Sequence, residues 1–306
     1  MKTLVFGHKS PDTDSTGSPI IWAWYLNEIG GGDAEAVLLG EPGTEAAFLL
    51  SRWNLPKPRI ISDIEEGQAC VIVDTNNPAE LPDGICKADI REIIDHHKLV
   101  GGLETVSPIN VTIRPLACTA TIMIDLMGKD AAGMPDWVKG TALTCILSDT
   151  LAFRSPTTTD HDQAIAENLA SDLGIAIPDY AAEMFNAKSD VSSFSDAELI
   201  RMDSKEYEVG GKKFRVSVLE TTSPDMVLSR KSGLIKTMEN VQKEDGVDQV
   251  LMFVIDILNE EATLLVPNDF VREMAEKSFN STATGDTAVL PGIMSRKKQI
   301  IPSLSI

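Results

Sequence analysis

Several features are scarce in this sequence of 306 residues, and each scarcity excludes a class of protein. No apolar run approaches the roughly 20 residues that a transmembrane helix needs. The first apolar stretch follows Met1-Lys2 directly, which leaves no room for a secretory signal peptide. We therefore expect a cytoplasmic protein that does not enter a membrane.

Cysteine is also scarce. The four residues, Cys70, Cys86, Cys118 and Cys145, form no CxxC pair and lie in apolar stretches. This spacing argues against a disulfide framework and against a zinc ribbon. We expect reduced cysteines in the protein core.

Positive charge is the third deficit. Lysine and arginine number 27 against 46 aspartates and glutamates, which gives a net charge of −19. Nucleic acid is therefore not expected as a main partner, because its phosphates require a basic surface. A small anion bound through metal ions stays open, since the ions bring their own charge.

The N-terminal stretch has the composition of a binding site. Thr3–Phe6 is predicted to be a short buried strand, and His8, Asp12 and Asp14 follow it. An amphipathic helix is predicted from about Pro19 to Ile29, capped by the residues before it. Strand, polar loop and helix place ligands at the carboxyl edge of an α/β sheet.

Further strands and helices alternate over the first 150 residues. We predict strands at 34–39, 70–73 and 90–94 and helices at 46–53, 119–127 and 137–147. This alternation indicates an α/β fold with a doubly wound parallel sheet. Asp74, Asp95-His96-His97 and Asp149 follow three of these elements.

A second, smaller domain is predicted after a short polar linker. The pattern is helical over 159–187 and then becomes serine-rich. Beyond it, strands at 214–219, 250–257 and 262–266 with hairpin-like spacing, and helices at 234–241 and 271–279, predict a mixed sheet with helices. We place the N-terminal domain at 1–188, the linker at 189–195 and the C-terminal domain at 196–306.

Histidine is rare but concentrated. Three of only four histidines (His8, His96 and His97) stand at predicted strand ends, each near an aspartate. For His161, at a predicted helix start, a structural role is the simpler interpretation. A convergence of Asp12, Asp14, Asp74, Asp95 and Asp149 without cations would be repulsive. Two imidazoles and four carboxylates can hold two metal ions, with one carboxylate bridging them. Mixed oxygen and nitrogen ligands suit Mn²⁺ and could also accept Co²⁺, Zn²⁺ or Mg²⁺.

Two such ions favour phosphoryl transfer. They can hold a bridging hydroxide and stabilise both the attacking and the leaving oxygen. The C-terminal cluster offers Arg296 and Lys297 for the outer phosphate oxygens. A merely solubilising tail explains that cluster equally well.

Five motifs occur along the chain in a fixed order: Gly7-His8-Lys9-Ser10-Pro11-Asp12-Thr13-Asp14-Ser15, Asp74-Thr75-Asn76, Asp95-His96-His97, Arg114–Thr119 and Ser148-Asp149-Thr150, followed by the C-terminal cluster Ser295-Arg296-Lys297-Lys298-Gln299. These motifs resemble those of the DHH phosphoesterases, and the C-terminal cluster narrows the resemblance to the manganese-dependent, family II inorganic pyrophosphatases. The similarity spans essentially the whole chain. This sequence differs from the family pattern at Ser10, a position where asparagine is common in the family.

The resemblance implies hydrolysis of pyrophosphate to two phosphates, by direct attack of a metal-bridging hydroxide. His8, Asp12 and Asp74 would bind one metal, and the bridging Asp74 would join Asp14, His96 and Asp149 at the other. Asp95 would orient a histidine. The catalytic residues would be His97, on the leaving-group side, with Lys205, Arg296 and Lys297 on the pyrophosphate.

The same resemblance implies two α/β domains with the active site in the cleft between them. It also implies two Mn²⁺ per subunit, further Mg²⁺ arriving with the substrate, and a homodimer. No nucleotide-sensing insertion is expected, because Asp149 and Lys205 are too close in sequence to contain one.

Two other functions are compatible with parts of the pattern. Another DHH phosphoesterase would act on short oligonucleotides, nucleoside bisphosphates or polyphosphate, but a C-terminal GGGH-like motif is missing and the charge of −19 disfavours an exonuclease. A non-catalytic metal- or phosphate-binding regulator would be expected to have lost ligands, whereas every expected ligand position is filled.

Overall fold

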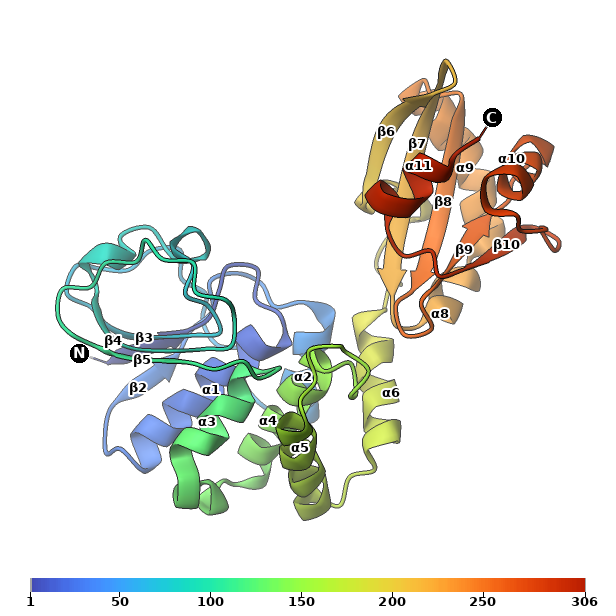
Figure 1. The fold of residues 1–306 in the computed structure, drawn as a ribbon. Coiled ribbons are helices and arrows are strands. Elements are labelled where there is room, and N and C mark those ends of the chain that lie inside the picture. The colour runs from blue at the N-terminus through green and yellow to red at the C-terminus, as the bar shows by residue number, and fades with distance from the viewer. Residues whose placement is uncertain (1, 306) are drawn as a thin grey trace. The chain divides into compact units, whose positions relative to one another are not determined.

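The computed structural model describes residues 2–305, which form two compact units divided in the sequence between Ala187 and Lys188 (Figure 1). The predicted linker residues 189–195 belong to the second unit, where Arg230 donates hydrogen bonds to the carbonyl oxygens of Val191 and Phe194.

The first unit contains the predicted parallel sheet. Its five strands, in spatial order, are β2 (Ala34–Ala36), β1 (Thr3–Phe6), β3 (Ala69–Val73), β4 (Asp89–Asp95) and β5 (Asn110–Ile113), and every pairing is parallel. β1 and β3 are neighbours although β2 separates them in the sequence. The chain direction across the sheet reverses there, and such a switch point is where α/β sheets bind ligands.

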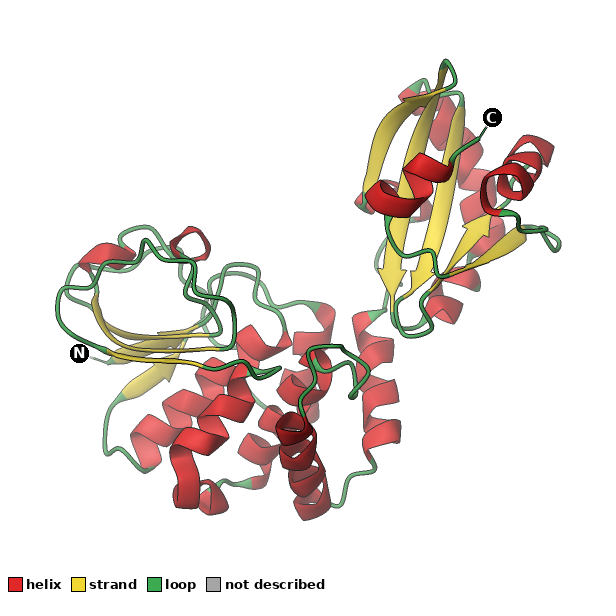
Figure 2. Ribbon diagram, viewed as in Figure 1, coloured by secondary structure: helices red, strands yellow, loops and turns green. Residues whose placement is uncertain are grey.

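One face of this sheet is covered by helices and the other by loops (Figure 2). The loop-covered face buries Phe6, Ile72 and Ile90 against segments that contain two short 3₁₀ helices, η1 (Pro78–Glu80) and η2 (Ile85–Lys87). All five residues of β3 are buried. This explains its continuous apolar run, because a central parallel strand is covered on both faces.

The sequence predicts the positions of several helices of the first unit, with two differences. They are α1 (Thr13–Glu28), α2 (Thr44–Arg52), α3 (Thr119–Met127), η3 (Gly128–Gly133), α4 (Asp136–Asp149), α5 (Asp160–Leu173) and α6 (Ile177–Lys188). The predicted start of α1 at Pro19 is wrong, because Asp12 caps the helix by accepting a hydrogen bond from the Ser15 amide. The single helical pattern predicted over 159–187 is two helices, since Gly174 ends α5 in a left-handed conformation.

The second unit contains the predicted mixed sheet. Its strands, in spatial order, are β10 (Thr287–Pro291), β9 (Glu261–Leu265), β8 (Gln249–Asp256), β7 (Lys212–Thr221) and β6 (Ser204–Val209). The hairpin-like spacing is right for β8 and β9, which pair antiparallel, but wrong for β7 and β8. These two are parallel, because α9 (Lys231–Asp245) lies between them in the chain and makes the crossover.

Both faces of this second sheet are buried. Val250, Met252 and Val254 of β8 pack with α7 (Asp196–Met202) and α9, while the alternate residues Leu251 and Phe253 pack with α10 (Asp269–Phe279). Two short helices, α8 (Pro224–Leu228) and α11 (Ile301–Ser303), complete the unit. Successive side chains of β8 thus point to opposite faces of the sheet, and both faces are covered by helices.

The cysteines follow the prediction in part. Each is a free thiol, and Cys70, Cys118 and Cys145 are buried, but Cys86 is exposed on η2 rather than part of the core. Over residues 2–305, the structure contains no helix with the length and apolar character required to cross a bilayer.

Candidate metal centre

The loop after β1 fixes the first predicted ligands. The His8 amide donates to Ser15 Oγ at 2.7 Å, so that the loop folds back onto the first turn of α1. His8 Nδ1 lies 2.8 Å from the Lys9 carbonyl oxygen, which accepts the ring proton and leaves Nε2 available to a cation. Gly7 permits this fold, since a Cβ there would lie 1.9 Å from Ser15 Oγ.

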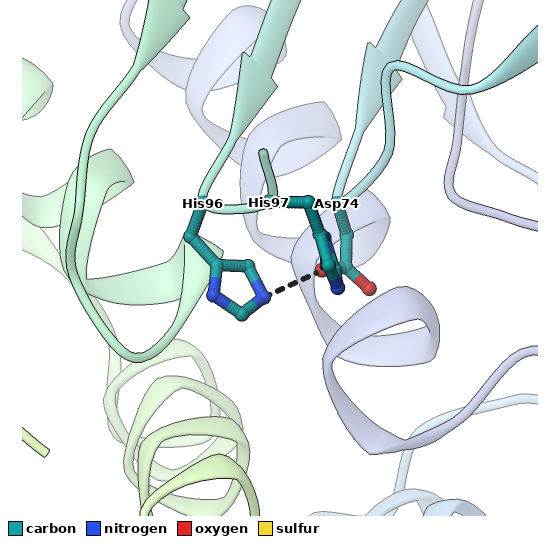
Figure 3. Close-up of side chains that lie close together, drawn as sticks. All are labelled: Asp74, His96 and His97. Atoms are coloured by element: carbon teal, nitrogen blue, oxygen red, sulfur yellow. Dashed lines mark ion pairs between the residues drawn. The ribbon is translucent and has the colours of Figure 1, made fainter. Parts of the chain in front are cut away.

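Asp74 lies at the centre of the cluster, directly after β3. Its backbone adopts φ +57°, a left-handed conformation that is costly for a residue other than glycine, and its side chain is buried. Oδ2 lies 3.5 Å from His8 Nε2, and Oδ1 lies 3.2 Å from His96 Nε2 (Figure 3). One carboxylate thus faces two imidazoles through different oxygens, which is the geometry of a bridging ligand.

A second set of ligand atoms comes from α1, the end of β4 and the end of α4. Atoms of Asp14, His96 and Asp149 lie within 4.8 Å of one another. The Thr119 amide, at the start of α3, donates to Asp14 Oδ2 at 2.7 Å. His96 Nδ1 lies 3.3 Å from the Leu116 carbonyl oxygen, which directs Nε2 toward the cluster.

All six predicted metal ligands therefore come together in two groups of three. One group is His8, Asp12 and Asp74, and the other is Asp14, His96 and Asp149. A third combination of suitable atoms is Asp74, His96 and His97 (Figure 3). His161 belongs to none of these groups among residues 2–305, and its Nε2 lies 2.8 Å from Asp125 Oδ1, as a structural role predicts.

His97 is oriented differently from the other two histidines. Its Nδ1 lies 2.9 Å from Asp95 Oδ1, and its amide donates to the same oxygen at 3.0 Å. The hydrogen bond to Asp95 raises the pKa of His97 above its usual value, against the effect of burial. Because Nδ1 is engaged and 52% of the side chain is exposed, His97 can present Nε2 to a bound anion.

The buried carboxylates are poorly accommodated without a cation. Burial, followed by the negative charge of Asp14, raises the pKa of both Asp74 and Asp149. The Oδ2 atom of each is buried and accepts no hydrogen bond from the described residues. Burial lowers the pKa of His8, but Asp12 and Asp74 outweigh it and raise that pKa to about 9. Orphaned oxygens beside two imidazoles fit divalent cations.

Thr119 is a functional neighbour that the sequence did not single out. Besides the amide bond to Asp14, its hydroxyl donates to Asp74 Oδ1 at 3.2 Å, so it contacts one ligand of each group. It stands in the Arg114–Thr119 motif and begins a helix. Only its place in that motif could have indicated this position.

A pocket of about 370 Å³ adjoins the cluster within the first unit. His8 and His97 form one part of its lining, with Lys9, Ser10, Asn76 and Lys98 among the other lining residues. Imidazole, amide and ammonium groups in one pocket suit a small, highly charged anion.

In the second unit, Arg296 is hydrogen-bonded to the segment that precedes Lys205. Arg296 donates from Nη1 to the Asp203 carbonyl oxygen at 2.8 Å and from Nη2 to Asp203 Oδ1 at 2.7 Å. Lys205 stands two residues after Asp203, on β6, and is exposed. Lys297 is exposed beside Arg296 in the π-helical turn η4 (Arg296–Ile300), a kind of turn found often at functional sites.

The comparisons with known proteins cover both units. Residues 2–148 match the DHH family N-terminal domain, and residues 182–305 match the DHHA2 domain. The chain is 33% identical over 306 residues to a Lactobacillus gasseri protein and 35% identical over 305 residues to one from Shouchella clausii, each named "Probable manganese-dependent inorganic pyrophosphatase". These matches cover 99% of this chain and 98% and 97% of the two relatives.

A solved structure agrees with these relatives. A Methanococcus jannaschii protein of known crystal structure, described as a "putative family II inorganic pyrophosphatase", is 34% identical to this chain, with a TM-score of 0.63 and coverage of 99% of this chain and 98% of that one. An exopolyphosphatase-related protein from Bacteroides fragilis, at 15% identity and a TM-score of 0.51, shares the fold alone. With two domain matches in order and full-length relatives above 30% identity, the chain belongs to the manganese-dependent, family II inorganic pyrophosphatases of the DHH superfamily.

Proposed function

We propose that the chain hydrolyses inorganic pyrophosphate to two phosphates at a dinuclear Mn²⁺ centre. The observation that supports this most directly is the position of Asp74, whose two oxygens face His8 and His96 from the centre of two adjoining ligand groups. In this proposal Asp74 is the ligand shared by both ions.

Each ion would have its own ligands besides Asp74. His8 and Asp12 would bind one ion, and Asp14, His96 and Asp149 the other, with Co²⁺, Zn²⁺ or Mg²⁺ as substitutes and further Mg²⁺ arriving with the substrate. When bound, divalent cations supply a hydroxide nucleophile near neutral pH and neutralise phosphoryl oxygens. Asp95 fixes the proton of His97 on Nδ1, which leaves Nε2 to contact the departing phosphate.

We also propose that Lys205, Arg296 and Lys297 bind the pyrophosphate oxygens. Asp203 occupies one N–H on each terminal nitrogen of Arg296 and so orients the guanidinium without using all five donors. The remaining donors suit a phosphate. Gln299 stabilises the turn that presents Arg296, because its Oε1 accepts hydrogen bonds from the amides of Met294 and Ser295.

Phosphate release by metal-stripped protein, reloaded with Mn²⁺, Co²⁺, Zn²⁺ or Mg²⁺, tests this function. Pyrophosphate, tripolyphosphate, a nucleoside bisphosphate and a short oligonucleotide are compared in parallel. We expect fast release from pyrophosphate alone, stimulated by Mn²⁺ or Co²⁺. Cleavage of the nucleotides instead would assign the chain to another DHH activity, and no release from any substrate would favour a binding protein.

We propose a homodimer in the cytoplasm, and the four free thiols suit that compartment. β5 is an edge strand of its sheet. Val111 on this strand and Val106, four residues before the strand begins, are exposed, which suits pairing with a second copy. We expect Val111→Lys to convert the dimer to a monomer in sedimentation velocity. Val289→Lys, at an exposed valine on the edge strand β10, is the matched control. An unchanged dimer in the Val111 variant would exclude this face.

A further inference from the structure

A buried glutamate lies beside the candidate metal centre without belonging to it. Glu45, in the first turn of α2, is only 6% exposed. Its Oε2 accepts a hydrogen bond from Thr13 Oγ1 at 2.9 Å and another from Ser148 Oγ at 2.7 Å. None of the proposed ligands comes from α2, so this acid has no part in the chemistry described so far.

The two hydroxyls that Glu45 accepts come from segments that supply ligands. Thr13 stands between Asp12 and Asp14 at the start of α1, and Ser148 directly precedes Asp149 in the last turn of α4. Both are buried. Thr13 is adjacent to Asp14 in the chain, and Ser148 is adjacent to Asp149. Oε2 of Glu45 therefore connects the two segments that position Asp14 and Asp149.

We propose that Glu45 is a positioning residue of the metal centre, which sets the spacing between Asp14 and Asp149. The inference rests on the proposed dinuclear centre. Hydrogen bonds to a carboxylate are short and strong, and a buried carboxylate requires them. Any displacement of Thr13 or Ser148 moves an adjacent ligand. Loss of such an outer partner typically lowers metal affinity about 10–100-fold.

The two ions should depend on Glu45 to different degrees. The Asp14–His96–Asp149 group takes two of its three ligands from segments that Glu45 links. The other group takes only Asp12 from them. Asp12 and Asp14 are each held by a further hydrogen bond, from the Ser15 amide and the Thr119 amide respectively, so the difference between the two ions rests on Asp149. Glu45→Ala should therefore weaken one Mn²⁺ much more than the other.

Mn²⁺ binding alone tests the proposal, with the metal-stripped full-length protein titrated and free Mn²⁺ counted by electron paramagnetic resonance. We expect two ions in the wild type. In Glu45→Ala, one ion should bind about 10–100-fold more weakly and the exchange-coupled spectrum of the pair should be lost. Glu45→Gln should stay within a few-fold of wild type, because its carbonyl oxygen still accepts both hydroxyls.

Two further variants separate the hydrogen bonds from charge and stability. Ser148→Ala removes one of the two bonds and should weaken the same ion, with an effect that does not add to that of Glu45→Ala. Glu41→Gln removes the same charge from a nearby glutamate whose side chain is 72% exposed, and should change nothing. If Glu45→Ala does not fold, Ser148→Ala and Glu45→Gln decide the question.

Several results would overturn the proposal. Unchanged affinity for both ions in Glu45→Ala or Ser148→Ala would show that the link does not position ligands. Equal weakening of both ions, or an equal loss in Glu45→Gln, would assign the effect to stability or to charge. A wild type that binds two Mn²⁺ and hydrolyses pyrophosphate while Glu45→Ala binds Mn²⁺ equally would refute this inference alone. A wild type that binds no Mn²⁺ would refute the proposed centre as well.

Discussion

At the scale of the residue, Asp74 shows how backbone conformation positions a proposed metal ligand. It is buried, left-handed at φ +57°, and faces both His8 and His96. Strained conformations at non-glycine residues persist where the surroundings impose them, often at active sites. The strain here places both carboxylate oxygens between two imidazoles.

Replacement of Asp74 by asparagine gives a sharp prediction. Asparagine tolerates the left-handed region, so the fold should survive, but a neutral amide is a poor bridging ligand. We expect hydrolysis of pyrophosphate and binding of Mn²⁺ to fall by more than the roughly 10–100-fold that loss of an outer partner costs. Asp269→Asn, at a side chain 96% exposed in the second unit, is the control. Two tightly bound Mn²⁺ and full activity in Asp74→Asn would contradict the bridging role.

Ser10 is a second left-handed residue, with φ +58°, in the loop between His8 and Asp12. Asparagine is several-fold enriched in this conformation, which corresponds to about 0.5–1 kcal/mol. Ser10→Asn should therefore raise the free energy of unfolding by about 0.5 kcal/mol in urea titrations, with little change in activity. Ser10→Val, a β-branched residue, should be destabilising. If both variants are equally stable, the loop is not strained at this position.

The sequence indicates the candidate ligands that the fold brings together, but not the side chains that support them. Histidine is rare and the aspartates stand at element ends, so His8, Asp74 and His96 are visible without a structure. Glu45 is not, because a glutamate beside Ala46 in an amphipathic helix usually faces solvent, and only the tertiary fold buries it.

At the scale of the element, the predictions succeed where the hydrophobic pattern is strong. The continuous apolar run of β3 and the apolar residues of α3 are predicted at or within one residue of their bounds. β5 is not among the predicted strands, although its sequence Asn-Val-Thr-Ile alternates polar and apolar residues; the segment is only four residues long and all four are exposed or half-buried. The early start of α1 is missed because a proline inside a helix normally marks its first turn.

Ion pairs between side chains join three elements of the second unit, and they predict that its stability depends on pH. Asp245, at the end of α9, lies 2.9 Å from Arg201 Nη2 on α7 and 2.6 Å from Arg215 Nε on β7. The hydrogen bond from Arg201, with the charge of Arg215, lowers the pKa of Asp245 below its usual value. The ionised form is therefore favoured in the folded state.

The sign of the effect follows from that depressed pKa. The contribution of ionised Asp245 to stability is fully present above the pKa of about 4 that an aspartate has in the unfolded chain. This contribution is lost as the pH falls through the lower pKa that Asp245 has in the folded state. We expect the stability of the second unit to decline below about pH 4, and Asp245→Asn to be less stable at pH 7 with a flatter decline in acid. Thermal unfolding at pH 3 to 7 measures this. Parallel acid profiles for the two proteins would show that another group is responsible.

At the scale of the whole molecule, the division of roles between the two units predicts where metal stabilises the chain. All six proposed ligands belong to the first unit, whereas the hydrophobic clusters around Phe253 and Met252 belong to the second. A ligand that binds only the folded state stabilises it by about 2.7 kcal/mol at 100 times its Kd. That stabilisation should be confined to the cooperative unit that contains the ligands.

Hydrogen exchange with and without Mn²⁺ tests this directly in the full chain. We expect Mn²⁺ to slow exchange in β1, β3, β4 and the first turns of α1, and to leave β7 and β8 nearly unchanged. Ca²⁺, which prefers six to eight oxygen ligands, serves as the control for charge alone and should protect these segments less than Mn²⁺ does. Equal protection of both sheets by Mn²⁺ would mean that the units unfold as one, and that the metal acts on the entire molecule. Protection of the second unit alone would place the ions elsewhere and contradict the ligand assignment.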